Sequence, residues 1–481
     1  IPGVAGIGEK GAKSLIQEYG NLENLLENAS QLTRKAYREG LAEHRHLAEL
    51  SKDLATIHRD IDIPFEPDQL HRDPPDQERL LELFRELEFF TLVAELEDAA
   101  AAQRKPAEPA VEARTPEAWS SAAAAFEGED LYALTLGEQD LVGLVVAGGE
   151  ADPVFGDLRR EGLRETMAAS LEGWLGDPAR TVVGHDLKEV LRLAPREVPV
   201  EARLFDTMLA SYVLHPSLRS HALEEVALDR LHAKATTAAG AGWTKKRGVE
   251  VPPDLGSPDL LAYAGERLDL VRRLREDLEE ALQGGPLEEV YRTIEEPLVP
   301  VLVGMEERGV LLDCAFLGEM SAELEADVAA LEGEIYQLAG ERFNVNSPQQ
   351  LGVILFEKLG YPVMRRTQKT KSYATGAEVL EQLAARGYPL PERILRFREL
   401  AKLKSTYVDA LPALVGEDGR LHTRFNQAVA ATGRLSSANP NLQNIPVRTE
   451  RGQQIRKAFV AAPGNLLLVA DYSQVELRIL A

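Results

Sequence analysis

The 481-residue chain carries 78 acidic and 54 basic side chains, which give a net charge of −24 at pH 7. This excess of negative charge argues against a general polyanion-binding protein, because phosphate contacts need lysine and arginine. No run approaches the roughly 18 consecutive apolar residues of a membrane-spanning helix, and a single cysteine, Cys314, excludes an internal disulfide framework. Both observations favour a protein of the reducing cytoplasm without a membrane partner.

Residues 1–98 are predicted to be mostly helical, because apolar residues recur at helical spacing in Ala12–Ile16, Leu22–Leu26 and Leu80–Leu96. The composition then changes. Residues 99–116, AAAAQRKPAEPAVEARTP, combine alanine, proline and charge without an apolar period, which is typical of a linker.

Residues 117–285 show short apolar runs that alternate with helical patterns, which predicts an α/β domain. Strands are expected at Leu131–Leu136, Leu141–Val146 and Thr181–Val183, and helices at Leu158–Leu175, Leu187–Leu193 and Leu260–Leu282. From residue 286 to residue 481 the helical patterns lengthen. This part is predicted to contain helices at Leu287–Arg308, Phe316–Leu338, Ala377–Ala385 and Glu392–Leu411, a basic loop at Arg365–Thr375 and a buried strand at Leu466–Ala470.

Basic residues concentrate in this last part despite the negative total. Residues 396–460 include 11 basic and 5 acidic side chains, and residues 361–377 include four basic side chains and no acidic one. The local field matters more for a cleft than the total charge. These segments are therefore candidates for phosphate contact, with a merely solvated surface as the alternative.

The strongest chemical signal is the segment DYSQVELR at residues 471–478, directly after the apolar run LLLVA. A buried strand fixes the carboxylate at its tip, and Mg²⁺ prefers such oxygen ligands together with substrate phosphates. The alternative is a helix-capping aspartate. The segment resembles the first polymerase motif of family A DNA polymerases. The resemblance implies that Asp471 holds two catalytic Mg²⁺ ions, that the Tyr472 carbonyl adds a metal ligand, and that Glu476 packs beneath the incoming sugar.

A polar, proline-broken segment lies upstream, with TGRLSS at residues 432–437 and NPNLQNIPVR at residues 439–448. Amides and arginines can contact base edges and phosphates, although such a segment is more often an ordinary loop. It also resembles family A polymerases. The resemblance implies that Arg434 reaches the primer-terminal base pair from the minor groove, and that Asn441, Asn444 and Arg448 hold template and primer.

Four lysines resemble those of the polymerase thumb, the helical subdomain that lies along the duplex. Lys402 and Lys404 belong to the expected thumb helix, but residues two apart do not share a helical face, so one of them is expected to be only solvated. Lys369 and Lys371 lie in the basic loop, and the resemblance implies that they contact backbone phosphates.

The N-terminal segment PGVAGIGEKG is a glycine-rich turn that opens onto a helix. Gly6 and Gly8 allow positive φ and close backbone approach, and a helix N-terminus offers free amides to a phosphate. The segment, including Lys10, resembles the helix–hairpin–helix of the DNA polymerase I 5′-nuclease domain, which implies duplex binding through a K⁺ ion. The alternative is an ordinary helix-start loop. The acidic residues that would cut DNA are absent from this part.

The middle region resembles a ribonuclease H-like 3′–5′ proofreading exonuclease in its framework, but it lacks the metal carboxylates. The strand at Leu131–Leu136 has no Asp-x-Glu, and Val190 and Arg267 stand where two further aspartates are expected. Two metals need clustered carboxylates, so hydrolysis is expected to fail, as in Thermus-type polymerases. The remaining acids are expected to be surface or packing residues; they are Asp206, Glu266 and Asp269.

Together these features identify the chain as a piece of a bacterial family A DNA polymerase, expected to be truncated at both ends. Residues 1–98 correspond to the end of the 5′-nuclease domain, residues 117–285 to the degenerate exonuclease-type domain, and residues 286–481 to the thumb and first part of the palm. The implied partners are primer–template DNA and dNTPs, bound by a monomer near the nucleoid. The chain alone is expected to be inactive. A non-catalytic DNA-binding module and an active 3′–5′ exonuclease are the alternatives.

Overall fold

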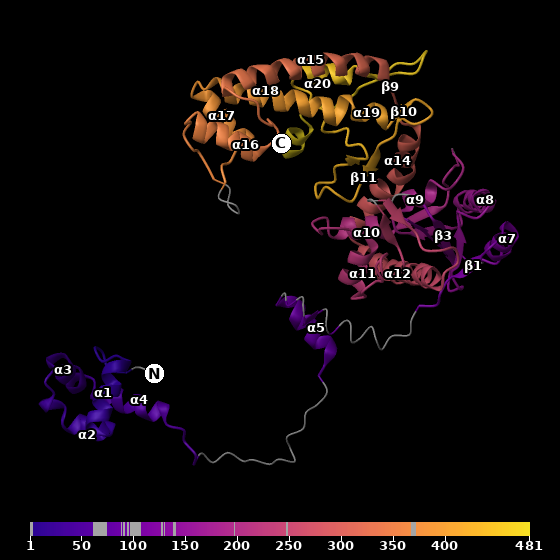
Figure 1. Cartoon of the computed structure of the whole chain (residues 1–481). Coiled ribbons are helices and arrows are strands. Elements are labelled where there is room, and N and C mark those ends of the chain that lie inside the picture. Colours follow the sequence, from indigo (N-terminus) through magenta and orange to yellow (C-terminus); the bar gives the residue numbers. More distant parts are fainter. Residues whose placement is uncertain are drawn as a thin grey trace. The chain divides into compact units, whose positions relative to one another are not determined.

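The computed structural model describes residues 3–60, 75–87, 89, 92–93, 96, 107–126, 128, 130–137, 141–196, 198–246, 249–366 and 372–481. The chain divides into two compact units, Ile1–Glu82 and Leu83–Ala481 (Figure 1). None of the described helices is long and apolar enough to cross a membrane.

The first unit is helical, as the apolar spacing predicts. Its helices bury Leu15, Leu25, Leu26 and Leu41 in a small core, and the Asn21 side chain caps α2 by accepting a hydrogen bond from the Asn24 amide at 2.8 Å. The elements are α1 (Glu9–Tyr19), α2 (Leu22–Glu27), η1 (Ala29–Gln31), α3 (Lys35–Glu43), α4 (Arg45–Ala55) and α5 (Gln77–Glu86), the last of which crosses the boundary between the units.

The second unit begins with a six-stranded mixed sheet in the order β1-β4-β3-β2-β5-β6. β2 pairs antiparallel with β3 and parallel with β5, so that Tyr132 lies opposite Ala147 on one side and Val183 on the other. The predicted strands near residues 131, 141 and 181 are therefore confirmed. The strands are β1 (Val111–Ala113), β2 (Asp130–Leu136), β3 (Gly143–Gly148), β4 (Val154–Asp157), β5 (Thr181–Gly184) and β6 (Arg203–Asp206).

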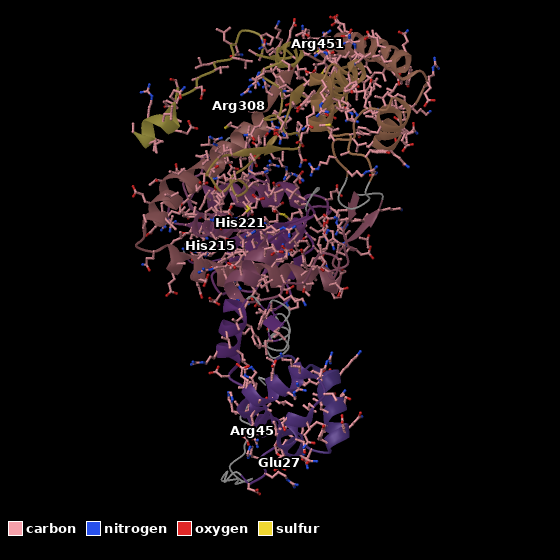
Figure 2. All side chains as sticks on the ribbon, turned by 90° about the vertical axis from the view of Figure 1, so that its left-hand side faces the viewer. Glu27, Arg45, His215, His221, Arg308 and Arg451 are labelled. Carbon is pink, nitrogen blue, oxygen red and sulfur yellow. The ribbon has the colours of Figure 1, made fainter. Side chains whose placement is uncertain are left out.

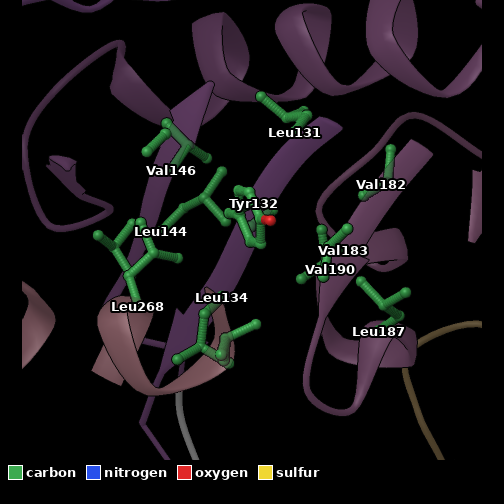
Figure 3. Packing of buried hydrophobic residues seen from close by; sticks show 14 of the residues in the cluster. Leu131, Tyr132, Leu134, Leu144, Val146, Val182, Val183, Leu187, Val190 and Leu268 are labelled. Carbon is green, nitrogen blue, oxygen red and sulfur yellow. The ribbon is translucent and has the colours of Figure 1, made fainter. Parts of the chain in front are cut away.

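Helices cover this sheet, and we refer to residues 107–285 as the α/β region. Helix α12 contacts β2, β3 and β5, whereas α7 contacts β1 and β4 and α8 contacts β4. Figure 3 shows how Leu131, Val146, Val183 and Val190 pack in the resulting core. The remaining elements are α7 (Pro116–Ala124), α8 (Leu163–Leu175), α9 (Leu187–Leu191), α10 (Thr207–Leu214), α11 (Leu223–Leu231), the hairpin β7 (Thr244–Lys246) and β8 (Val249–Val251), and α12 (Pro258–Leu282).

The end of the predicted linker belongs to the sheet. Val111–Ala113 form the edge strand β1, which pairs parallel with β4, and Pro116 begins α7 after the Thr115 cap. The alanine- and proline-rich composition favours a linker, and a strand of three residues is too short to show an alternation of apolar and polar side chains. Residues 99–106 lie outside the described part of the chain.

A continuous helical run then leads from the α/β region into the last part of the chain. It consists of α13 (Pro286–Val290), the π-helical turn η3 (Tyr291–Glu295) and α14 (Glu296–Arg308), and it ends at Gly309, whose φ of 55° favours glycine. Tyr291, Val299 and Val303 face the core of the α/β region. The run therefore packs with the sheet rather than with the helices that follow it.

The last part is mainly helical. Helices α15 (Cys314–Ala339) and α18 (Pro389–Leu403) lie side by side (Figure 1). Arg451 of α20 (Glu450–Arg456), labelled in Figure 2, pairs with Glu323 and Asp327 of α15 at 3.1 and 2.9 Å. The other elements are a sheet of β10 (Arg420–Leu421), β9 (Val310–Leu312) and β13 (Phe459–Val460), the hairpin β11 (Arg424–Asn426) and β12 (Ser436–Ala438), and helices α16 (Pro348–Gly352), η4 (Val353–Lys358), α17 (Ala377–Ala385), η5 (Lys404–Val408), α19 (Ala410–Ala413) and α21 (Val475–Leu480).

The predicted buried strand at Leu466–Ala470 is wrong. These residues form neither a strand nor part of a core, and the side chains of Leu466 and Val469 are 94% and 88% exposed. A strand needs hydrogen-bonding neighbours, and no strand in the described part of the chain pairs with this segment. Residues 466–470 therefore do not join any sheet of the described structure.

Candidate nucleic-acid interface

The hairpin β11–β12 presents the first group of predicted DNA-binding residues. Asn426 pairs with Ser436, so residues 427–435 form the hairpin loop and place Arg434 beside the start of β12. The buried Ser437 hydroxyl accepts hydrogen bonds from the Leu442 and Gln443 amides at 3.0 and 3.3 Å. This network fixes the turn that follows β12 and leaves Asn441, Asn444 and Arg448 exposed on it.

Two of the predicted polar residues also maintain this turn. The Asn441 Oδ1 accepts hydrogen bonds from the Ser437 hydroxyl at 3.2 Å and the Gln443 amide at 3.0 Å. The Asn444 carbonyl accepts one from the Tyr407 hydroxyl at 2.6 Å, which ties the turn to η5. Their exposed positions and fixed backbone suit contact with a ligand.

The structure brings Arg434 to the DYSQVELR segment. Its Nη2 lies 3.1 Å from the Glu476 carboxylate, and both side chains are more than 70% exposed. An exposed ion pair contributes at most about 1 kcal/mol, so Arg434 can exchange it for another contact at little cost. Arg434, which the resemblance implies at the primer end, thus lies beside Glu476, which it implies beneath the incoming sugar.

Asp471 and Tyr472 are exposed, and Asp471 does not cap a helix. Helix α21 starts later, with Gln474 as its N-cap, so the capping alternative for Asp471 is wrong. Among the described residues no three His, Cys, Asp or Glu side chains gather in a group that could hold a metal ion. The donors in the described part of the chain therefore do not by themselves complete a two-metal site.

The two lysines of the predicted thumb helix have different surroundings. Lys402 is exposed in the last turn of α18, whereas the Lys404 ammonium lies 2.9 Å from Asp409 and 3.9 Å from Glu325. Lys402 is thus the better placed of the two for a phosphate. Lys369 and Lys371 lie outside the described residues.

Two glycines of the N-terminal turn, Gly3 and Gly6, adopt positive φ. Gly6 adopts a φ of 83°, and the Ile7 amide closes a turn onto the Val4 carbonyl at 3.1 Å. Gly8 caps α1 with a φ of −81°, so the positive φ expected there is not used. Lys10 is exposed in the first turn of α1, beside the free helix amides.

Comparisons with known proteins identify the family of the last part of the chain. Residues 314–481 match the model described as DNA polymerase family A, and residues 1–78 match the model described as 5′-3′ exonuclease, C-terminal SAM fold. Residues 314–481 belong to DNA polymerase family A. This family A region contains Arg434, Asp471 and Glu476.

Curated relatives resemble the whole chain. It is 41% identical to the thermostable DNA polymerase I of Thermus thermophilus and 38% identical to the DNA polymerase I of Pseudomonas aeruginosa, in each case over all of this chain. It covers 52% and 56% of those proteins, so it spans about half the length of the curated relatives it matches. A solved structure, the POL domain of Pol1 from M. smegmatis in complex with DNA primer-template and dNTP, is 30% identical with a TM-score of 0.60, covering 77% of this chain and 62% of that one.

The two positions at which the resemblance to an exonuclease leads us to expect metal carboxylates have structural roles. Val190 is fully buried in the α/β core (Figure 3), and Arg267 pairs with Glu224 at 2.6 Å while its guanidinium lies over the Tyr263 ring. Neither position can ligate a metal.

The acids that remain in the α/β region also serve the fold. Asp206 is buried and accepts hydrogen bonds from the amides of Asp186, Leu187, Met208 and Leu209, so it caps α10. Glu266 accepts one from the Thr236 amide, and Asp269 pairs with Arg273 at 3.8 Å. The expectation that these acids are surface or packing residues is confirmed.

A cavity of about 350 Å³ lies beside this cap, lined in part by His185, Asp186, Trp243 and Arg267. Burial and then the Arg267 charge lower the pKa of His185 to about 3, which keeps the imidazole neutral. Burial and then the Asp206 charge raise the pKa of Asp186 to about 7. The Asp186 Oδ1 is buried without a hydrogen-bond partner, so ionisation of this carboxyl is costly.

Asp186 therefore predicts a pH-dependent stability. A carboxyl whose pKa is raised on folding destabilises the fold above its unfolded pKa of about 3.8, and the cost grows until pH 7. Asp186→Asn is expected to be more stable than the wild type, with a difference that widens by about 2 kcal/mol between pH 5.5 and pH 8 at roughly 1.4 kcal/mol per pH unit. Urea unfolding at several pH values measures it.

The matched control is Asp269→Asn, which neutralises a partly exposed carboxylate on α12. Its unfolding free energy is expected to run parallel to that of the wild type. If the unfolding free energy of Asp186→Asn also changes with pH in parallel with that of the wild type, Asp186 is not the group that titrates.

Sequence reasoning missed the residues that hold the loop of the family A region. Gln427 is buried and donates to the Glu295 carbonyl at 3.1 Å and to its carboxylate at 2.6 Å, and Glu306 accepts the Phe425 amide at 2.6 Å. The available signal was a glutamate, Glu306, on the otherwise apolar buried face of α14. Such a residue needs a buried partner.

Proposed function

We propose that this chain is part of a DNA-directed DNA polymerase, and that residues 286–481 form the thumb and first part of the palm. One observation carries the proposal: the Arg434 loop and the DYSQVELR segment of a family A region meet through the Arg434–Glu476 pair. The exposed side chains of Asn441, Asn444 and Arg448 lie on the adjoining turn. Primer–template DNA and dNTPs are the proposed ligands, as in the similar POL domain complex.

The proposed roles divide between phosphate and base contacts. Lys402 and Arg448, together with Lys369 and Lys371, supply positive charge to the duplex backbone, while Arg434 contacts minor-groove acceptors that all base pairs share. Such contacts test the shape of a base pair without reading its sequence. Lys404, which pairs with Asp409, is the weaker candidate for a phosphate contact. Asp471 and the Tyr472 carbonyl are proposed as ligands of two Mg²⁺ ions, as part of a donor set that the described residues do not complete, and Glu476 as the residue beneath the incoming sugar.

The rest of the chain fits the same proposal. The α/β region, which includes the end of the predicted linker 99–116, is proposed as a degenerate ribonuclease H-like 3′–5′ exonuclease domain, because a core valine and a salt-bridged arginine replace two of its metal ligands. The N-terminal turn with Gly6, Gly8 and Lys10 is proposed to bind duplex phosphate through a K⁺ ion. The chain is proposed to act as a monomer at the nucleoid, in the cytoplasm.

Binding to a labelled primer–template junction tests the function. Arg434→Ala and Arg448→Ala are each expected to weaken binding about 3- to 10-fold, because a charge-assisted contact contributes roughly 1 kcal/mol or more. The affinity of the wild type is expected to fall steeply with salt. Fluorescence anisotropy at two salt concentrations measures both effects.

Arg164→Ala is the matched control, because Arg164 is an exposed arginine on α8 of the α/β region. Its affinity is expected to equal that of the wild type. Unchanged binding by both Arg434→Ala and Arg448→Ala would contradict the proposed interface.

A further inference from the structure

The loop that carries Arg434 is anchored from outside the family A hairpin. At its base, the Lys188 ammonium donates to the Phe425 carbonyl at 2.5 Å, and Arg424 pairs with Glu189 at 2.8 Å. Both partners belong to α9 of the α/β region. The β11 strand therefore sits against that region rather than only against its own hairpin partner.

A second anchor lies within the loop itself. The Tyr212 hydroxyl of α10 donates to the Ala430 carbonyl at 2.8 Å. The same carbonyl accepts the Gly433 amide at 3.2 Å, which closes a tight turn, and Gly433 has a φ of 79°. Arg434 is the next residue. The hydrogen bond from Tyr212 thus acts on the turn that sets the direction in which Arg434 leaves the backbone.

Tyr212 is itself held rigidly. The residue is buried, and its ring meets the His221 ring edge-on with centroids 5.6 Å apart (Figure 2 labels His221). His221 is fixed in turn by Ser211, whose hydroxyl lies 3.0 Å from its Nδ1. A ring locked by packing presents its hydroxyl at a defined point, which is what a positioning contact requires.

We propose that the α/β region positions the primer-contacting loop of the polymerase, with Tyr212 as the positioning residue for Arg434 and Lys188 as the support at the base of the loop. This inference rests on the proposed function. It gives a region without metal carboxylates a defined role: it holds residues 427–435 in the geometry in which Arg434 meets DNA.

A double-mutant cycle on the whole chain tests the proposal. Tyr212→Phe removes one hydroxyl and keeps the ring, so it is expected to weaken primer–template binding about 3- to 10-fold, the value of one hydrogen bond. In an Arg434→Ala background the same change is expected to alter the affinity less than about 2-fold, because the positioned group is gone. Trypsin is expected to cut faster after Arg434 in Tyr212→Phe, as followed by the fragment that begins at Leu435.

Tyr132→Phe is the matched control, since it removes the hydroxyl of another largely buried tyrosine in the α/β region. It is expected to leave both DNA affinity and cleavage after Arg434 unchanged. A loss of affinity in Tyr212→Phe that persists fully without the Arg434 side chain overturns the positioning role alone. If Arg434→Ala itself binds like the wild type, the proposed DNA contact fails and the positioning role falls with it.

Discussion

Glu306→Ala is expected to lower the free energy of unfolding by about 3–5 kcal/mol, the usual cost of breaking a buried ion pair from one side. Glu306 is almost fully buried and accepts from Lys188 at 2.9 Å, from Arg192 and from the Phe425 amide at 2.6 Å. Burial alone raises the pKa of Glu306, but these partners bring it below its usual value. Its removal leaves the buried Lys188 ammonium without its carboxylate and an amide without an acceptor. Urea unfolding measures the loss.

Two variants separate the parts of this effect. Glu306→Gln keeps an oxygen for the Phe425 amide but removes the charge, so it is expected to lose less than the alanine variant. Glu307→Ala changes the next residue on α14, which is partly exposed, and is expected to stay within about 0.5 kcal/mol of the wild type. Equal stabilities for Glu306→Ala and Glu307→Ala would show that the network contributes nothing.

Val190→Asp, which places an acid where the proposed resemblance to an exonuclease expects a metal ligand, is expected to destabilise the α/β region by at least about 3 kcal/mol at pH 8. Val190 has no exposed surface and packs among apolar side chains that include Val183 and Leu187 (Figure 3). A carboxylate there loses its hydration without gaining a partner. Because protonation relieves part of this cost, the loss is expected to be smaller at pH 5.5.

Val190→Asn is the control of similar shape without a charge, and its loss is expected to be the same at both pH values. Neither variant is expected to shorten a labelled DNA strand with Mg²⁺, because Arg267 still occupies another ligand position and β2 has no Asp-x-Glu. Strand shortening by Val190→Asp would restore the hypothesis of an exonuclease.

The sequence predicted best those elements whose signal is local. Residues 316–338 repeat apolar side chains over six turns, and α15 spans Cys314–Ala339 with the Asp313 side chain as its cap. Likewise α17 matches the predicted range Ala377–Ala385. The apolar pattern was insufficient for strands, because a strand forms only where it pairs with a segment that is often distant in the chain. β1 has only three residues, and the apolar run 466–470 looks like a buried strand although no described strand pairs with it.

The candidate site shows the same division. The motifs identify Arg434 and Glu476, and the structure places them in contact. The supporting contacts join residues far apart in the chain, such as Tyr212 with Ala430 and Lys188 with Glu306. Tyr212 lies in an apolar helix and Lys188 in a short helix, and the sequence around them does not indicate these partners. The partners depend on how the α/β region packs against the part of the chain that follows it.

The helical run α13–η3–α14 has a consequence for dividing this protein into fragments. Tyr291, Val299 and Val303 belong to the core of the α/β region. A recombinant piece that starts at Pro286 therefore exposes these apolar side chains to solvent. A piece that ends at Gly285 lacks the wall of its own core. A cut after Gly309, where the helix has ended, keeps that core intact. The domain border expected from the sequence, at residue 286, therefore differs from the border of the packed core, at Gly309, by roughly one long helix.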